Sequence, residues 1–238
     1  MTTGPVSSRH ARACPPDAVL FDLDGTLVDS VPDLTRCVNA ALAHAGQPAV
    51  TQAQVRGWVG NGASRLLHRA LTGRRDGHAP AAEHTAALAV FNAHYAADPC
   101  RDSRLYPGVL ETVTGLRRAG VLLAVVTNKP SQFVAPLLDK LGLGDTFACH
   151  VGGDSTPRLK PDPLPVRHAL GLVECAADRA FLVGDSHVDM MAGRAAGVAT
   201  VAVTYGYDPA CDFRALGAVA VLDRLTQLPT LWGVAAPV

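Results

Sequence analysis

Short apolar runs without alternating polar residues recur along this chain, most of them in its second half. Runs of this kind are typical of parallel strands that are buried on both faces, because a strand with one wet face alternates apolar and polar residues. The runs predict strands at Ala18–Phe21, Val121–Val126, Ala148–Val151, Ala180–Val183 and Thr200–Val203.

Segments with helical periodicity separate these runs, and each ends at or next to a glycine, which is a common helix stop. They predict helices at Val109–Ala119, Ser131–Leu141, Asp162–Leu170 and Ser186–Ala196. A repeated order of strand then helix favours an open parallel sheet with helices on both faces. The sequence therefore predicts an α/β fold with a doubly wound, Rossmann-like core.

The interval after the first predicted strand breaks this rhythm, because roughly a hundred residues are too many for a single crossover. Helical patterns fill it at Val31–Ala45, Gln52–Val59, Ala63–Leu71 and Ala81–Tyr95. We therefore predict a helical domain inserted at residues 31–104. Residues 18–30 and 105–238 would form the core, and residues 1–17 a disordered extension.

Composition and charge exclude several classes of protein. The chain has 238 residues, 48% of them hydrophobic and 18% charged, and its formal net charge is +0. This composition is typical of a globular protein, and without excess basic charge nucleic acid is not an expected partner. No signal peptide or membrane-spanning run is recognisable. The scattered cysteines favour free thiols in a reducing compartment, so we expect a cytoplasmic protein without a membrane partner.

Two carboxylates, Asp22 and Asp24, directly follow the first predicted strand. Carboxylates are seldom buried unless they are paired or bind a cation. Side chains at positions i and i+2 leave an extended strand on the same face, so both carboxylates can approach one reacting centre. This pair indicates a metal site, a reaction centre, or both.

Other predicted strand ends carry comparable residues. Thr127-Asn128 follows the second strand, Lys160-Pro161 follows the third, and Asp185 with Asp189 follows the fourth. Because the carboxyl ends of parallel strands face one crevice, these side chains are expected to meet. The set suits a phosphorylated substrate, because a divalent cation and a lysine would offset the negative charges. Oxygen ligands favour Mg²⁺.

These motifs in this order resemble those of the haloacid-dehalogenase-like phosphohydrolases, over most of the chain from Ala18 to about Tyr207. The motifs are Asp22-Leu23-Asp24-Gly25-Thr26, Thr127-Asn128, Lys160-Pro161, and Gly184-Asp185-Ser186 with Asp189. The helical insert is similar to the type-one cap of that family. An acid at Asp24 argues against the dehalogenase and ATPase branches of the family.

The resemblance implies a role for each residue. Asp22 would attack phosphorus and become an aspartyl phosphate, while Asp24 would act as general acid and then general base. Asp22, the carbonyl of Asp24, and Asp185 would hold Mg²⁺. Asp189 would ligate the metal through water or orient Lys160. Thr127 and Lys160 would complete the catalytic set.

A closer resemblance is to the phosphoglycolate phosphatase branch, carried by Trp58–Ala63, Val126–Pro130, Phe133–Leu138, Val151–Asp154 and Val203–Tyr207. It implies hydrolysis of a small phosphorylated metabolite, 2-phosphoglycolate. Thr127, Asn128 and Lys160 would contact the substrate from the core, and Asn61 and Arg65 from the cap. The chain is expected as a monomer or a homodimer.

Three alternatives stay open at this point: a phosphatase acting on sugar phosphates, a β-phosphoglucomutase of the same family, and a non-catalytic regulatory module. The last is disfavoured because such a module should have lost at least one of the four residues that carry the chemistry. Those residues are Asp22, Asp24, Lys160 and Asp185.

Overall fold

A six-stranded parallel sheet forms the centre of the computed structural model, which describes residues 15–234. Its strand order is β5-β4-β1-β6-β7-β8, and every pairing is parallel. The strands are β1 (Ala18–Phe21), β4 (Leu122–Val126), β5 (Cys149–Val151), β6 (Ala180–Gly184), β7 (Ala199–Val203) and β8 (Ala220–Leu222). The predicted α/β class is confirmed. The predicted disordered extension at 1–17 lies outside the described residues except for positions 15–17.

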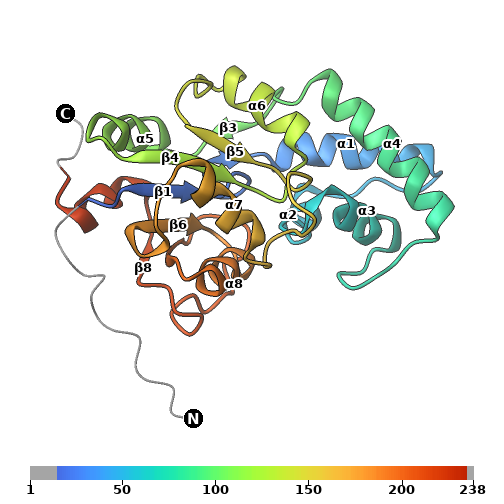
Figure 1. Ribbon diagram of the computed structural model, residues 1–238. Coiled ribbons are helices and arrows are strands. Elements are labelled where there is room, and N and C mark those ends of the chain that lie inside the picture. The colour runs from blue at the N-terminus through green and yellow to red at the C-terminus, as the bar shows by residue number, and fades with distance from the viewer. Residues whose placement is uncertain (1–14, 235–238) are drawn as a thin grey trace, which may run out of the picture.

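Helices cover both faces of this sheet. On one face lie α5 (Val109–Arg118) and α6 (Val134–Lys140), and on the other lie α7 (Leu164–Leu172) and α8 (His187–Ala196). Side chains of β1 alternate between these layers: Phe21 packs in the cluster with α5 and α6, and Leu20 packs in the cluster with α7 and α8. Both faces are therefore apolar, which explains the uninterrupted hydrophobic runs in the sequence. Figure 1 shows the two helical layers on opposite sides of the sheet.

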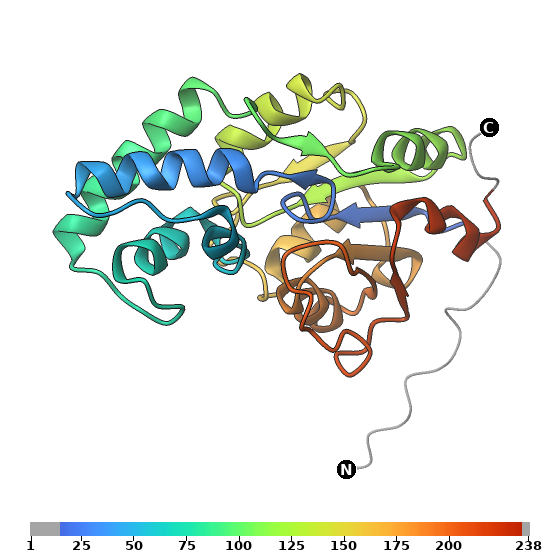
Figure 2. The ribbon, with the colours of Figure 1, turned by 180° about the vertical axis from the view of Figure 1, so that it is seen from behind.

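A third hydrophobic cluster, separate from the two on the faces of the sheet, joins the helices between β1 and β4. These are α1 (Val31–His44), α2 (Gln52–Arg56), α3 (Gly62–Thr72) and α4 (Ala81–Ala97). Phe91 and Tyr95 on α4 pack in this cluster with residues of α1 and α3, and Phe133 joins it from the core. In Figures 1 and 2, β1 points toward this group of helices. We propose that α1–α4, the cap helices, form a cap domain over the carboxyl edge of the sheet.

Two short strands connect the core to the cap helices. β2 (Val28–Asp29) pairs antiparallel with β3 (Arg104–Leu105) where the chain leaves the core and where it returns. The carboxylate of Asp33 accepts hydrogen bonds from the backbone N–H groups of Asp102 and Ser103 at 2.9 and 2.8 Å. The two connections between the core and the cap helices are thus held together beside the first turn of α1.

The remaining short elements are 3-10 turns: η1 (Ser131–Phe133), η2 (Ala177–Arg179), η3 (Leu225–Gln227) and η4 (Pro229–Trp232). η1 occupies the start of the helix predicted at Ser131–Leu141. α7 begins at Leu164 rather than at the predicted Asp162, with Pro163 at its N-cap and Pro165 in its first turn, where a proline is tolerated. Over residues 15–234, none of the helices combines the length and apolar character needed to cross a membrane.

Candidate active site

Three neighbouring strands end in polar residues at the same edge of the sheet. Asp22 follows β1, Thr127 follows β4, and Asp185 follows β6. β1 lies between the other two strands, and Phe21 pairs with Val125 on one side and Val183 on the other. Parallel pairing therefore places the three side chains together, as the strand-end pattern predicted.

Lys160 lies at the centre of this group and bridges two carboxylates. Its ammonium donates to Asp22 Oδ1 at 2.8 Å and to Asp189 Oδ1 at 2.7 Å. A third hydrogen bond runs to the backbone carbonyl of Val126 at 2.5 Å. Burial lowers the pKa of Lys160, but the carboxylates of Asp189 and Asp22 outweigh this effect and raise the pKa above its ordinary value. The buried lysine is therefore a fixed positive charge.

Asp22, Asp185 and Asp189 form a buried acidic triad whose ligand oxygens all lie within 4.8 Å of one another. Burial raises the pKa of Asp22 to about 7 even though Lys160 opposes the shift. Burial, together with the charges of Asp22 and Asp189, raises the pKa of Asp185 well above its ordinary value. One lysine thus leaves the triad short of positive charge. An all-oxygen set with this deficit fits a divalent cation.

Asp185 is held by two donors and by the close packing of two glycines. Thr26 Oγ1 donates to its Oδ1 at 2.9 Å, and the backbone N–H of Tyr207 donates to its Oδ2 at 2.7 Å. A methyl group at Gly25 or at Gly206 would collide with its carboxylate. Gly25 also has φ +98°, a conformation that side chains other than glycine rarely adopt.

Asp24 is paired with a second buried lysine. The Lys129 ammonium lies 3.0 Å from Asp24 Oδ1 and 4.5 Å from the centre of the Tyr95 ring. Burial lowers the pKa of Lys129, but the charge of Asp24 and the contact with Tyr95 raise it above its ordinary value. Because Tyr95 lies on α4, this lysine links the core acid to the cap helices.

Asn128 joins three segments of the chain. Its side-chain N–H₂ donates to the carbonyls of Gly60 and Lys160, both at 2.9 Å, and its Oδ1 accepts from the backbone N–H of Lys160 at 2.9 Å. The neighbouring Thr127 Oγ1 accepts from the backbone N–H of Lys129 at 3.2 Å. Asn128 therefore ties the loop after α2 to the loop that carries Lys160.

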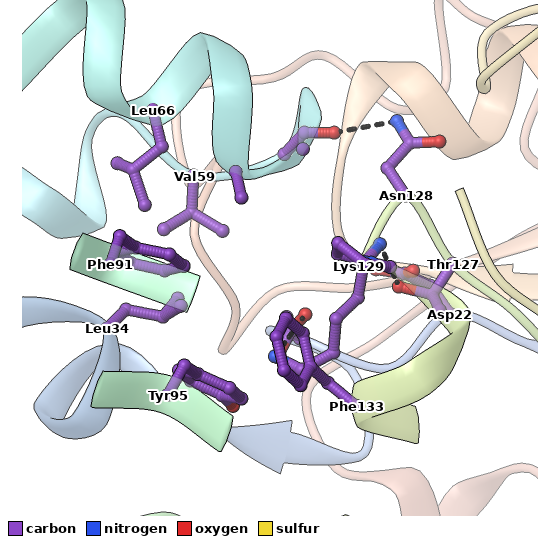
Figure 3. A pocket seen from close by; sticks show the side chains of 15 residues that line it. Asp22, Leu34, Val59, Leu66, Phe91, Tyr95, Thr127, Asn128, Lys129 and Phe133 are labelled. Carbon is purple, nitrogen blue, oxygen red and sulfur yellow. Dashed lines mark hydrogen bonds and ion pairs between the residues drawn. The ribbon is translucent and has the colours of Figure 1, made fainter. Parts of the chain in front are cut away.

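Two cavities adjoin the carboxylates, and both are lined by Asp22, Asp24, Val59 and Gly60. The first, the apolar cavity, is also lined by Thr127, Lys129 and a group of side chains comprising Leu34, Leu66, Phe91, Tyr95 and Phe133. Figure 3 shows these apolar side chains facing Lys129, Thr127 and Asp22. The second, the acidic cavity, is also lined by Lys160, Asp185, Asp189, Asn61, Arg75 and His187.

The two cap residues predicted to contact substrate have different positions. Asn61 lines the acidic cavity, and its Oδ1 accepts from Arg69 Nη2 at 2.8 Å. Arg65 is absent from the described residues that line either cavity. Its guanidinium donates instead to the carbonyls of Gly77 at 2.7 Å and Arg75 at 3.1 Å. Arg65 therefore contacts the loop between α3 and α4, and its predicted contact with substrate stays a prediction.

Sequence reasoning assigned no role to Lys129, Tyr207 or Arg75. Lys129 stands two positions after Thr127 at the end of β4, and that position was an available signal. Tyr207 reaches Asp185 through its backbone N–H, which any residue other than proline supplies, so its side chain gave no signal. Arg75 lies in the loop between α3 and α4, where the sequence has no periodic pattern to place it.

The carboxyl edge of the doubly wound sheet carries a buried lysine and a cluster of carboxylates. Such an arrangement defines an α/β enzyme site. The sequence profile of the haloacid dehalogenase-like hydrolases matches residues 19–203. The chain belongs to that family, as the motifs at the strand ends predicted.

Curated relatives and a solved structure agree with this assignment. The chain is 45% identical over 214 residues to phosphoglycolate phosphatase 1 of Pseudomonas aeruginosa, covering 90% of this chain and 78% of that protein. It is 44% identical to the plasmid phosphoglycolate phosphatase of Cupriavidus necator, covering 91% and 93%. A crystal structure of a predicted phosphoglycolate phosphatase from Haemophilus somnus aligns with a TM-score of 0.84 at 35% identity, covering 90% and 97%.

Proposed function

We propose that this chain is a Mg²⁺-dependent phosphatase that hydrolyses 2-phosphoglycolate to glycolate and phosphate. The observation that carries the proposal is the position of Lys160, which bridges Asp22 and Asp189 beside Asp185. This arrangement gives a carboxylate nucleophile, a fixed positive charge and a set of metal ligands at one point. The names of the curated relatives support the choice of substrate.

Asp22, Asp185 and the backbone carbonyl of Asp24 would hold Mg²⁺. When bound, the ion offsets the repulsion between the phosphate and the carboxylates and draws electron density from phosphorus. Of the two roles predicted for Asp189, the 2.7 Å contact with Lys160 supports the orienting one. The raised pKa values of Asp22 and Asp185 support a need for positive charge beyond Lys160.

The proposed chemistry has two steps. Asp22 attacks phosphorus, the bond between phosphorus and the leaving oxygen breaks, and Asp24 gives a proton to the leaving alkoxide. Water then attacks the phosphorus of the aspartyl phosphate while Asp24 accepts a proton, which releases phosphate and restores Asp22. Lys129 lies 3.0 Å from Asp24 and would hold its carboxyl group in place during both steps.

The test is release of inorganic phosphate by the purified chain from a panel containing 2-phosphoglycolate, sugar phosphates and pyrophosphate, with and without Mg²⁺. We expect Mg²⁺-dependent release, with the highest kcat/KM for 2-phosphoglycolate. No release from any compound would overturn the phosphatase assignment. A higher kcat/KM for a sugar phosphate would overturn the substrate, and isomerised hexose phosphate from β-glucose 1-phosphate without phosphate release would identify a mutase.

A further inference from the structure

The loop between α3 and α4 is anchored by two arginines of α3. Arg69 Nε donates to the carbonyl of Arg75 at 2.8 Å, and Arg65 Nη2 donates to the same carbonyl at 3.1 Å. Arg69 also donates to the carbonyl of Trp58 at 2.5 Å and, as described above, to Asn61. One carbonyl that receives two guanidinium donors is held firmly. The loop is thereby fixed to the segment that lines the acidic cavity.

Arg75, an exposed residue of this anchored loop, is one of the residues that line the acidic cavity. Among residues 15–234 its guanidinium has no hydrogen-bond or ion-pair partner, although carboxylates surround the cavity. The other cations near the reaction centre are engaged, since Lys160 binds Asp22 and Asp189 and Lys129 binds Asp24. Arg75 is therefore the cation at this cavity that is available to an anionic ligand.

We infer that Arg75 binds a second anionic group of the substrate, a carboxylate on the part that is released as the alcohol. The inference rests on the proposed function. Lys160 and the divalent cation would neutralise the phosphate, so a carboxylate attached to it needs a positive partner of its own. A guanidinium suits this role because it can donate two parallel hydrogen bonds to a carboxylate. Arg75 is thus a specificity-determining residue, and Arg65 and Arg69 are positioning residues for it.

The adjacent Arg74 offers a matched control. Its side chain is 73% exposed and lies 3.7 Å from the carboxylate of Asp76. It belongs to the same loop, carries the same charge, and is absent from the described residues that line the acidic cavity. A general electrostatic effect of the loop would follow loss of either arginine, whereas carboxylate binding requires Arg75 alone.

The experiment compares the full-length wild type with Arg75→Gln, Arg75→Lys and Arg74→Gln on 2-phosphoglycolate and on ethyl phosphate, which lacks the carboxylate. The quantity of interest is the ratio of kcat/KM for the first substrate to that for the second. We expect Arg75→Gln to lower this ratio about tenfold to a hundredfold, mainly through KM, because a charged hydrogen-bond partner is lost. Arg75→Lys should restore part of the ratio, and Arg74→Gln should keep the wild-type ratio.

The possible failures are distinguishable. A ratio unchanged by Arg75→Gln, or lowered equally by Arg74→Gln, would overturn the role of Arg75 and leave the proposed function intact. If the wild type did not prefer 2-phosphoglycolate to ethyl phosphate, the role of Arg75 in binding a carboxylate would also be overturned. A wild type that prefers 3-phosphoglycerate to 2-phosphoglycolate would overturn the proposed substrate only. The Arg75 comparison would then be made with 3-phosphoglycerate and glycerol 1-phosphate.

Discussion

The ammonium of Lys129 lies 3.0 Å from the carboxylate of Asp24, and both groups are largely shielded from water. The lysine also contacts the ring of Tyr95 on α4. Because it touches a proposed catalytic acid and a cap helix at once, it connects the position of the cap helices with the charge at the reaction centre.

Replacement of Lys129 by Met should lower both stability and activity. The substitution keeps most of the volume but leaves the Asp24 carboxylate without its charged partner, which should lower the free energy of unfolding by about 1–3 kcal/mol. Urea unfolding measures the first effect, and the kcat for phosphate release measures the second.

Lys140→Met is the matched control, because Lys140 also pairs with an aspartate, Asp98, at 2.9 Å but at the surface. Exposed pairs contribute little to stability, so this variant should unfold at nearly the wild-type urea concentration. Equal losses in the two variants would contradict a special role for the buried pair.

Asp22→Asn should abolish turnover while the fold is retained, because an amide cannot act as the carboxylate nucleophile. We expect phosphate release to fall on the order of 10³-fold or more.

Asp24→Asn should instead slow both steps and allow phosphorylated protein to accumulate, since the proton donor and acceptor is lost. Phosphate release, labelling with ³²P-substrate and circular dichroism check these outcomes. Substantial Mg²⁺-dependent turnover by Asp22→Asn would exclude it as the nucleophile.

The sheet and the cap helices were largely predictable, because their signals are local. β1 has the predicted bounds, since an uninterrupted apolar run ends abruptly at Asp22. α1 and α4 follow from helical periodicity, and their ends differ from prediction by one or two residues. β2 and β3 were missed, because two residues are too few to form a pattern. β8, the short strand at one edge of the main sheet, was missed as well.

The catalytic grouping was predictable only as far as strand ends determine it. Asp22 and Asp185 follow neighbouring parallel strands, so topology alone brings them together. Lys129 and Asp24 are separated by 105 positions, and their contact depends on side-chain direction, which a single sequence does not encode locally. The contacts of Arg65 also depend on side-chain direction. The sequence therefore predicted a contact with substrate and did not indicate that its guanidinium binds two loop carbonyls.

Gly206→Ala should weaken metal binding although it replaces none of the carboxylates. The new methyl group would collide with Asp185, and the displaced carboxylate would no longer meet its partners in the acidic triad. Changes to groups that orient metal ligands typically weaken affinity by about 10- to 100-fold, and we expect a loss in that range for Mg²⁺. Titration calorimetry with Mg²⁺ alone measures it.

Gly171→Ala provides the control, because Gly171 lies in α7 with open space around its Cα. It should leave Mg²⁺ affinity unchanged and stabilise the helix by about 0.5–1 kcal/mol. Unaltered Mg²⁺ binding by Gly206→Ala would show that Asp185 is not a ligand or that it tolerates the displacement.

Asp33 should make the junction between core and cap helices sensitive to acid. Its side chain is fully buried, and it accepts hydrogen bonds from Arg36, Asp102 and Ser103. Burial alone would raise the pKa of Asp33, but these hydrogen bonds outweigh burial and lower the pKa below its ordinary value of 3.8. Asp33→Asn should therefore lower the free energy of unfolding at pH 7 by about 1.5–3 kcal/mol.

The difference in unfolding free energy between wild type and Asp33→Asn should depend on pH, because the pKa of Asp33 is lowered in the folded state. A carboxyl group whose pKa is lowered in the folded state stabilises the fold fully above its unfolded pKa, and the stabilisation disappears as the pH falls through the folded pKa. The gap between wild type and Asp33→Asn should hence be constant from pH 7 to 5 and shrink below the ordinary value of 3.8. Urea unfolding at stepped pH values measures the gap, with the surface variant Asp178→Asn as control. A gap that stays constant at pH values well below 3.8 would show that the charge of Asp33 does not hold the two connections together.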